Sequence, residues 1–203
     1  PGIRTTVFFK GCNLRCPWCS NPENIKFEIE HYSYGNESGT YGYKISLKEL
    51  FDEIIKDKDF YINGGGVTFS GGECLLQMKE IEPLLKKLKE EKINICIETA
   101  LTVPSFFLEI ALKYVDLFYV DMKILDENLV GKINGKVNIY RENLKLLDFL
   151  KKDYIIRIPI VNGYTYTSKN INEIIKMLNT IKPIKVEIFK IHNLANKKYE
   201  TLQ

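Results

Sequence analysis

Short apolar runs alternate with longer amphipathic segments along almost the whole chain. The runs have the length and the β-branched or aromatic content of strands, and they cover residues 3–9, 67–70, 93–97, 115–120, 154–160 and 184–189. The segments between them carry apolar residues at helical spacing, and they begin near residues 46, 78, 104, 139 and 170. This repeating order predicts parallel strands with helices packed outside them.

Six strand-and-helix units are too few to close an eight-stranded barrel. We therefore expect an α/β fold, an open partial (β/α)6 barrel with parallel strands and outer helices, formed by residues 1–203 as a single domain. Residues 24–43 are polar and rich in Tyr and Gly, which predicts a flexible surface loop. Because the chain starts at Pro1 without an initiator Met, we expect truncated termini.

Composition and charge exclude several classes of function. A chain of 203 residues that is 45% hydrophobic and 27% charged fits a globular domain with a sizeable core. The net charge is +3, and Lys and Arg are scattered among Asp and Glu, so no nucleic-acid partner is expected. No apolar run approaches the ~20 residues of a membrane span, and no leader precedes Ile3, so we expect a cytoplasmic protein without a membrane partner.

The placement of the cysteines indicates metal binding. Cys12, Cys16 and Cys19 are crowded together in a chain with 5 cysteines, a pattern that suits ligands better than disulfides. The C-x-x-x-C-x-x-C spacing offers thiolates to three irons of a 4Fe-4S cluster and leaves the fourth iron open to a ligand. A structural zinc site is the alternative, but it needs a fourth ligand, for which His31 is the nearby candidate. The lone Cys74 and Cys96 are expected in the core.

Polar residues follow the end of each expected strand. They lie at 12–19, 70–73, 98–99, 121–123, 157–162 and 192. Because parallel strands end on a common face, we expect these side chains to meet at one mouth of the open barrel.

Two sequence blocks resemble the activating enzymes of glycyl radical enzymes, which belong to the radical S-adenosylmethionine superfamily. The first block is PGIR followed by FFKGCNLRCPWC at residues 8–19, and the second is GGGVTFSGGE at residues 64–73. The resemblance spans nearly the whole chain and fades at residues 24–43, where the extra cysteines of some relatives are missing. One cluster is therefore expected.

The resemblance implies roles for particular residues. Cys12, Cys16 and Cys19 would hold the 4Fe-4S cluster, and with Lys123 they are the expected catalytic residues. Lys123 and Arg157 would face the carboxylate or ribose of S-adenosylmethionine, and His192 its adenosine. The full expected set for this cofactor is Trp18, Cys19, Ser20, Gly71, Gly72, Glu73, Asp121, Met122, Lys123, Arg157 and His192. Glu73 could hold either a strand edge or the ligand's ammonium group.

The resemblance also implies a monovalent cation, Na+ or K+. Its ligands would be Glu98, Thr99, the carbonyl of Tyr119 and Asp121, with Glu98 standing where the family has Asp. Two carboxylates in a partly desolvated mouth repel each other unless a cation or a proton intervenes. Protonated or solvated carboxylates are the competing explanation.

The implied activity is reductive cleavage of S-adenosylmethionine followed by removal of an α-hydrogen from a glycine of a partner glycyl radical enzyme. The implied electron donor is of the flavodoxin or ferredoxin type. A radical enzyme that modifies another peptide or a small molecule is the runner-up. A cluster or zinc module without catalysis would leave the residues at 71–73 and 121–123 unexplained.

Overall fold

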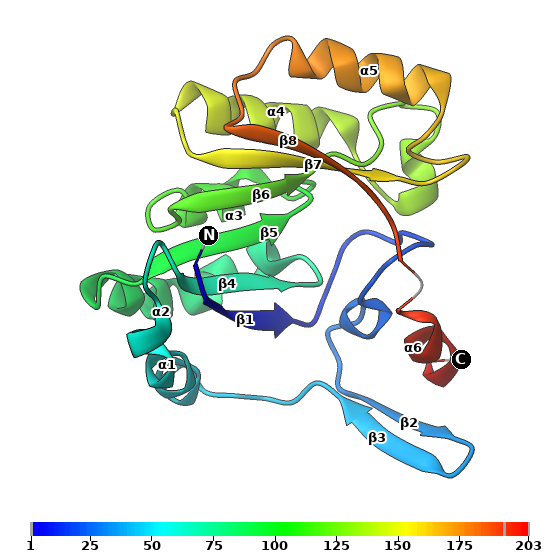
Figure 1. Ribbon diagram of the computed structural model, residues 1–203. Helices are drawn as coiled ribbons and strands as arrows, with labels where there is room; N and C mark the ends of the chain where they lie inside the picture. The colour runs from blue at the N-terminus through cyan, green and yellow to red at the C-terminus, as the bar shows by residue number, and fades with distance from the viewer. Residues whose placement is uncertain (1, 193, 203) are drawn as a thin grey trace.

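The computed structural model describes residues 2–192 and 194–202, and its main element is a parallel sheet (Figure 1). The sheet has six strands in the order β1-β4-β5-β6-β7-β8. These are β1 (Arg4–Phe9), β4 (Gly66–Gly71), β5 (Asn94–Thr99), β6 (Leu117–Asp121), β7 (Tyr154–Ile160) and β8 (Lys185–Lys190). Within this sheet, neighbouring strands follow one another along the chain, as the alternating pattern predicted.

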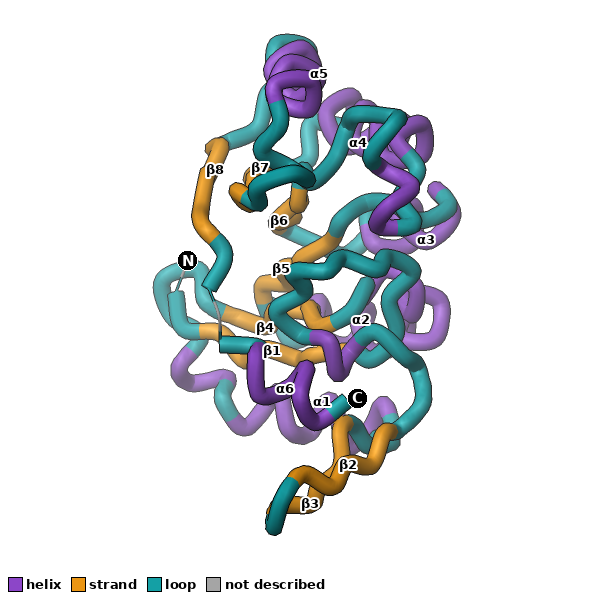
Figure 2. Tube along the Cα trace, turned by 90° about the vertical axis from the view of Figure 1, so that its right-hand side faces the viewer, coloured by secondary structure: helices purple, strands orange, loops and turns teal. Residues whose placement is uncertain are grey.

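Helices cover one face of this sheet and leave the other open. They are α1 (Leu47–Lys56), α2 (Met78–Glu90), α3 (Ser105–Ala111), α4 (Val137–Phe149) and α5 (Ser168–Leu178). Figure 2 looks toward the carboxyl ends of the strands and shows them as an arc, with these helices outside it and a gap between β8 and β1. The expectation of an open, partial barrel is confirmed. Among the described residues, no helix has the length and apolar character to cross a membrane.

Local sequence determines where α1 begins. The Ser46 hydroxyl accepts a hydrogen bond from the backbone N–H of Glu49 at 3.2 Å, and the Glu49 carboxylate accepts one from the backbone N–H of Ser46 at 2.9 Å. This capping box satisfies two amide groups that the first turn leaves free. Leu50, Phe51 and Ile54 are buried on one side of the helix, as their spacing predicted.

Alternation along the central strands separates the core from the site. Val67 and Phe69 of β4 and Ile97 of β5 are completely buried under the helices. The intervening residues, such as Ser70 and Glu98, point to the concave side of the arc, because successive side chains of a strand face opposite ways. Cys74 and Cys96 are both buried, at 0% and 1% exposure, as expected; Cys74 lies in the core under the helices, whereas Cys96 alternates with Ile97 and faces the inside of the arc.

Residues 24–43 do not form the surface loop that their composition suggested. They contain an antiparallel hairpin of β2 (Glu30–Tyr34) and β3 (Glu37–Tyr41). Tyr32 and Tyr41 stack across the hairpin with ring centroids 4.8 Å apart. A lone hairpin is marginally stable in water, but this one packs on a short C-terminal helix, α6 (Asn196–Thr201), which no sequence pattern predicted.

Candidate active site

One cavity of about 530 Å³ lies at the carboxyl ends of the strands, a size typical of sites for small molecules. Of the residues expected to bind the cluster or S-adenosylmethionine, the cavity is lined by Cys12, Cys16, Trp18, Cys19, Ser20, Gly71, Gly72, Glu73, Asp121, Lys123, Arg157 and His192. Met122 is the exception, because its side chain is completely buried in the core. The structure therefore brings together side chains from both ends of the chain.

The segment that follows β1 and carries Cys12, Cys16 and Cys19, here called the cysteine loop, is held in place by backbone hydrogen bonds. Gly11 donates to the carbonyl of Asn24 and Cys12 to that of Ile25, both at 2.9 Å, so the loop folds back against the segment that follows it. Gly11 has a φ of 99°, a conformation that favours glycine. Burial raises the pKa of the Cys12 thiol to about 11, and it also raises the pKa values of Cys16 and Cys19.

The three cysteines fit a 4Fe-4S cluster better than a zinc ion. Among the described residues, no group of three or more His, Cys, Asp or Glu side chains is arranged to share a single metal ion. A cubane cluster does not need such convergence, because each thiolate binds a different iron. His31, the candidate fourth zinc ligand, instead contacts the Thr40 hydroxyl within the hairpin at 3.0 Å.

Gly71 and Gly72 allow β4 to approach the cysteine loop closely. A Cβ on Gly71 would lie 2.4 Å from the backbone of Phe9, and one on Gly72 would lie 2.2 Å from the carbonyl oxygen of Gly11. Both contacts are with the protein's own backbone. Gly71 and Gly72 were expected among the residues that bind S-adenosylmethionine, and packing against the backbone of β1 and of the cysteine loop is a separate reason for glycine at both positions.

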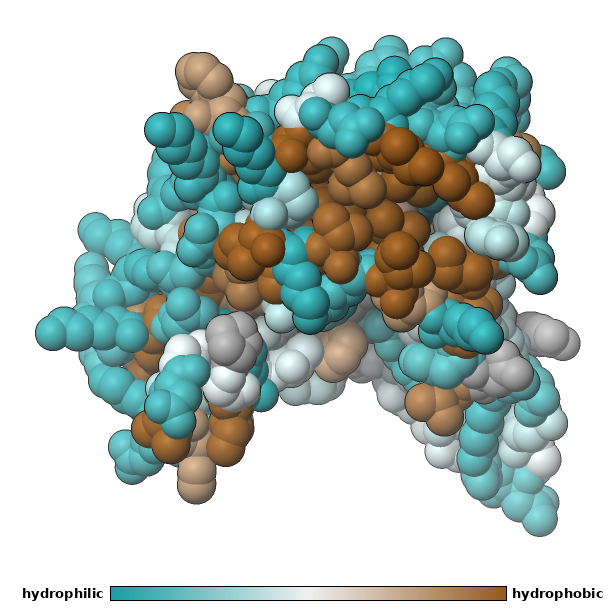
Figure 3. All heavy atoms as spheres, turned by 45° about the horizontal axis from the view of Figure 1, so that its top comes forward, coloured by the Kyte–Doolittle hydropathy of each residue, from teal (hydrophilic) through white to brown (hydrophobic). Residues whose placement is uncertain are grey.

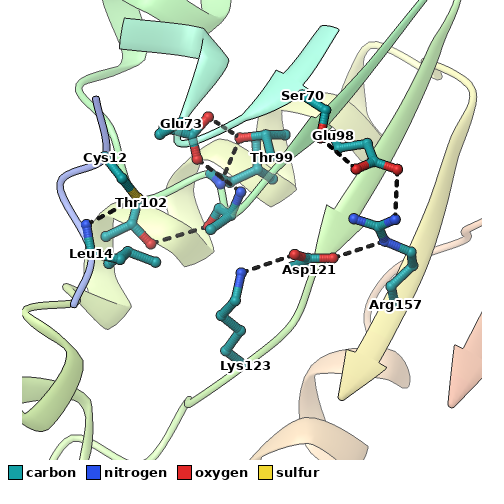
Figure 4. Close-up of polar contacts among 12 residues, drawn as sticks. Cys12, Leu14, Ser70, Glu73, Glu98, Thr99, Thr102, Asp121, Lys123 and Arg157 are labelled. Carbon is teal, nitrogen blue, oxygen red and sulfur yellow. Dashed lines mark hydrogen bonds and ion pairs between the residues drawn. The ribbon is translucent and has the colours of Figure 1, made fainter. Parts of the chain in front are cut away.

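Glu73 holds the end of β5. Its carboxylate, 1% exposed, accepts hydrogen bonds from the Thr99 hydroxyl at 2.7 Å and from the backbone N–H of Ala100 at 2.9 Å (Figure 4). Burial raises the pKa of Glu73, and the hydrogen bonds from Thr99 and Ala100 offset part of this rise. Of its two expected roles, these contacts fit the support of a strand edge.

Four charged side chains form a continuous chain across the strand ends (Figure 4). Arg157 lies between two carboxylates, 2.8 Å from Glu98 and 2.8 Å from Asp121, and Lys123 is 2.9 Å from the other oxygen of Asp121. Ser70 donates to the far oxygen of Glu98 at 2.7 Å. Burial alone would raise the pKa of Asp121, but the charges of Lys123 and Arg157 lower it. Each charge in this chain therefore has a partner.

This arrangement changes the argument for a monovalent cation. Arg157 bridges Glu98 and Asp121, so the guanidinium already offsets their repulsion. The Thr99 hydroxyl donates to Glu73, and the ring of Tyr119 lies 5.3 Å from the Arg157 guanidinium carbon. Like-charge repulsion gives no reason for a cation in this arrangement, and the cation stays a prediction.

The remaining lining residues include several that sequence reasoning missed. Trp18 packs on Tyr164 with ring centroids 5.0 Å apart, and His192 is exposed at the mouth. The missed residues are mostly apolar, and they include Phe8 and Phe189 in strands and Ile191 and Leu194 beyond β8. An apolar residue in or beside a strand is usually buried, so no signal in the sequence distinguished these side chains from those of the core.

Comparison with known proteins places this geometry in a family. The sequence profile of the radical SAM superfamily matches residues 6–181. The chain is 36% identical over 205 residues to the pyruvate formate-lyase-activating enzyme of Clostridium pasteurianum, covering 100% of this chain and 81% of that one. It is 31% identical over 252 residues to the trans-4-hydroxy-L-proline dehydratase activating enzyme of Clostridioides difficile, covering 100% of this chain and 83% of that one.

Solved structures share the fold. Streptococcus suis SuiB bound to its precursor peptide SuiA has a TM-score of 0.72 at 17% identity, over 100% of this chain and 42% of that one. A domain of the pyruvate-formate lyase-activating enzyme of Bacteroides vulgatus has a TM-score of 0.57 at 25% identity, over 64% of this chain and 83% of that one. With its cysteine loop, glycine turn and charged strand ends in one cavity, this chain belongs to the radical SAM superfamily, among the activating enzymes of glycyl radical enzymes.

Proposed function

We propose that the protein cleaves S-adenosylmethionine reductively and removes an α-hydrogen from a glycine of a partner glycyl radical enzyme. The observation that carries this proposal is that one cavity joins three free cysteines to the glycine turn and to the charged strand ends. When bound, a 4Fe-4S cluster would supply one electron to the sulfonium, giving methionine and a 5'-deoxyadenosyl radical that takes the glycine hydrogen.

Each part of the cavity has a role in this proposal. Cys12, Cys16 and Cys19 would bind three irons and leave the fourth for the amino and carboxylate groups of S-adenosylmethionine. Lys123 and Arg157 would bind the ligand's carboxylate or ribose in exchange for part of their contact with Asp121. Exchange for the ligand's carboxylate replaces one anionic partner by another, so it leaves no buried cation without an anion.

A radical that reacts with most C–H bonds must be enclosed, because it would otherwise attack groups other than the intended glycine. Within the described chain, no residue of the hairpin lines the cavity, which favours the partner over the hairpin as the cover. Figure 3 shows hydrophobic side chains gathered on one face of the molecule. Exposed apolar side chains on and beside β8 include Ile184, Val186, Ile188, Phe189, Ile191 and Leu194. We propose that the partner's glycine loop enters beside this strand.

We further propose a flavodoxin- or ferredoxin-type electron donor and a cytoplasmic setting. All five cysteines are free thiols, and reduced thiols are typical of that compartment. A donor of this type delivers one electron at a time, which is the requirement of the proposed cleavage.

Electron paramagnetic resonance tests the proposal directly. The reconstituted, reduced protein with S-adenosylmethionine should produce a doublet signal on a glycyl radical enzyme, and the doublet should collapse when the glycine α-hydrogen is replaced by deuterium. The Cys16→Ala variant is the negative control. Turnover of a free small molecule or another peptide, with no radical on any glycyl radical enzyme, would support the runner-up instead.

A further inference from the structure

The element that follows β8 is α6, which packs near the cysteine loop, on the residues just after it. Figure 2 shows α6 on the β1 side of the gap between β8 and β1. His192 and Leu194 of the connection between β8 and α6 line the cavity, as does Lys198 of α6. Residues of α6 and of the connection before it therefore form one wall of the site.

One side of α6 contacts the cysteine loop and the residues just after it. The Tyr199 hydroxyl lies 3.0 Å from the carbonyl oxygen of Cys19 and 3.3 Å from that of Pro17. The Lys198 ammonium lies 2.6 Å from a carboxylate oxygen of Glu23 and 3.2 Å from the side-chain oxygen of Asn21. These contacts join residues about 180 positions apart to a loop whose own structure is irregular.

The other side of α6 contacts the hairpin. Lys197 lies 2.6 Å from Glu37, with both side chains more than half exposed. The hydroxyls of Tyr41 and Thr201 are 2.9 Å apart. Lys197 and Lys198 thus each pair with a carboxylate, one on the hairpin and one beside the cysteine loop. Substitutions on the hairpin side can therefore serve as matched controls for those on the loop side.

The ion pair between Lys198 and Glu23 is more enclosed than the one between Lys197 and Glu37. The Glu23 side chain is 14% exposed and that of Lys198 33%. The second carboxylate oxygen of Glu23 is buried and has no hydrogen-bond partner among the described residues. Because water screens this pair incompletely, removing either charge leaves the other to act on the adjacent cysteine loop.

We propose that α6 is a latch for the cysteine loop, with Tyr199 and Lys198 as positioning residues; this inference rests on the proposed cluster site. Tyr199 holds the carbonyl groups of the loop, so the thiols keep the spacing that a cluster requires. Lys198 and Glu23 balance each other's charge beside the cluster, and the net charge around a cluster is one determinant of its reduction potential. The latch also anchors the cavity wall that carries His192.

Thiol labelling of the metal-free protein tests the first part. Tyr199→Phe removes the hydroxyl that holds Cys19, so iodoacetamide should label Cys12, Cys16 and Cys19 about fivefold faster than in the parent. Tyr41→Phe, which removes a hydroxyl on the hairpin side of α6, should leave the rates unchanged. Equal labelling rates in the two variants would overturn the positioning role of Tyr199.

Potentiometric titration of the reconstituted protein tests the second part. Lys198→Met should shift the cluster's reduction potential to more negative values, and Glu23→Gln should shift it to more positive values. Lys198→Arg should restore the parent value, and Lys197→Met should not change it. A merely structural effect would not shift the potential in opposite directions, so shifts of the same sign, or none, would overturn the charge balance.

These measurements separate the latch from the proposed function. Neither uses S-adenosylmethionine or a partner enzyme. If the parent assembled no 4Fe-4S cluster, the proposed function would fail while the labelling rates still decided the role of Tyr199. If a fully active enzyme gave identical labelling and identical potentials in all variants, the latch alone would be wrong.

Discussion

The two walls of the cavity differ in how far their polar groups are already satisfied. At the strand ends, Arg157 and Lys123 neutralise Glu98 and Asp121, so each charge has an opposite partner within 2.9 Å. On the cysteine loop no disulfide joins the three thiols, the Cys12 sulfur accepts only a long hydrogen bond of 3.4 Å from the backbone N–H of Leu14, and the buried side-chain oxygen of Asn13 has no partner among the described residues. The charges of the strand-end wall are therefore balanced within the protein, whereas the loop wall carries the thiols that we propose as cluster ligands.

This difference follows from backbone support. The strand-end charges project from neighbouring strands whose register is set by parallel pairing, such as Asp121 opposite Arg157. The loop has no ladder of its own and depends on contacts with Asn24, Ile25, Ile133 and α6. We therefore expect substitutions on the loop wall to affect assembly and those on the strand-end wall to affect ligand affinity.

The largest expected effect is on the loop wall. Cys16→Ala should abolish the 4Fe-4S cluster and all cleavage of S-adenosylmethionine, because two thiolates cannot hold three irons. Cys74→Ala removes a completely buried thiol outside the site and should leave the cluster content unchanged. Iron and sulfide analysis after anaerobic reconstitution measures both. Retention of the cluster in Cys16→Ala, with its loss in Cys74→Ala, would reverse the assignment.

The second effect lies where the walls meet. Gly72→Val should destabilise the protein by more than about 3 kcal/mol and lower cluster content together with ligand affinity, because the new Cβ would strike the carbonyl of Gly11. Gly131→Val is the control, since a Cβ there meets nothing within 4 Å. Denaturant unfolding and iron analysis measure the two quantities. A stable variant with an intact cluster and weaker ligand binding would instead indicate that Gly72 acts mainly by contact with S-adenosylmethionine.

The third effect belongs to the strand-end wall. Asp121→Asn should lower the free energy of unfolding by about 2–3 kcal/mol and weaken S-adenosylmethionine binding, while the cluster content stays at the parent level. The side chain of Asp121 is 20% exposed, which keeps this cost below that of a fully buried pair. Calorimetry measures the stability and the ligand affinity, and iron analysis measures the cluster content. Loss of the cluster in Asp121→Asn would contradict the expected difference between the two walls.

The same carboxylate predicts a pH dependence. The pKa of Asp121 is lower in the folded protein than in the unfolded chain, so its contribution to stability is complete above the unfolded value of about 3.9. That contribution is lost as the pH falls through the folded value. Unfolding measured between pH 6 and pH 2 should therefore show a smaller loss of stability in Asp121→Asn than in the parent. Identical pH profiles would show that Asp121 does not contribute.

The smallest expected effect concerns the monovalent cation. Because Arg157 already bridges Glu98 and Asp121, exchange of Na+ for K+ at constant ionic strength should change the cleavage rate of the parent less than about twofold. Glu98→Asp shortens the side chain by one methylene and should increase the dependence. A strong dependence on cation identity in the parent would instead place the cation at this wall.

The sequence predicted elements that local patterns determine. The capping box at Ser46 and the alternation in β4 and β5 each act within a few residues, and both are present in the structure. The hairpin was missed because its strands are short and polar, and α6 because six residues carry too little periodicity. Both become ordered through contacts between distant segments, such as Tyr41 with Thr201.

Residues of the site could be predicted more readily than their contacts. The cysteine spacing and the strand ends indicated which side chains share the cavity, because parallel strands end together. The partners of Arg157 could not be predicted, since its pairing with Glu98 joins residues 59 positions apart and depends on the register of three strands. The support that Glu73 gives to β5 likewise depends on how completely it is buried.

The sequence separation between α6 and the cysteine loop affects the order of biosynthesis. Cys19 leaves the ribosome early, whereas Tyr199 is made 180 residues later, and chains are synthesised from the N-terminus. β1 also waits for β4, because Arg4 pairs with Gly66. During translation the cysteines are therefore attached to a nascent chain that lacks both the strand and the helix that support them. If the loop binds the proposed cluster, its supporting contacts are therefore present only after the residues of α6 have been made.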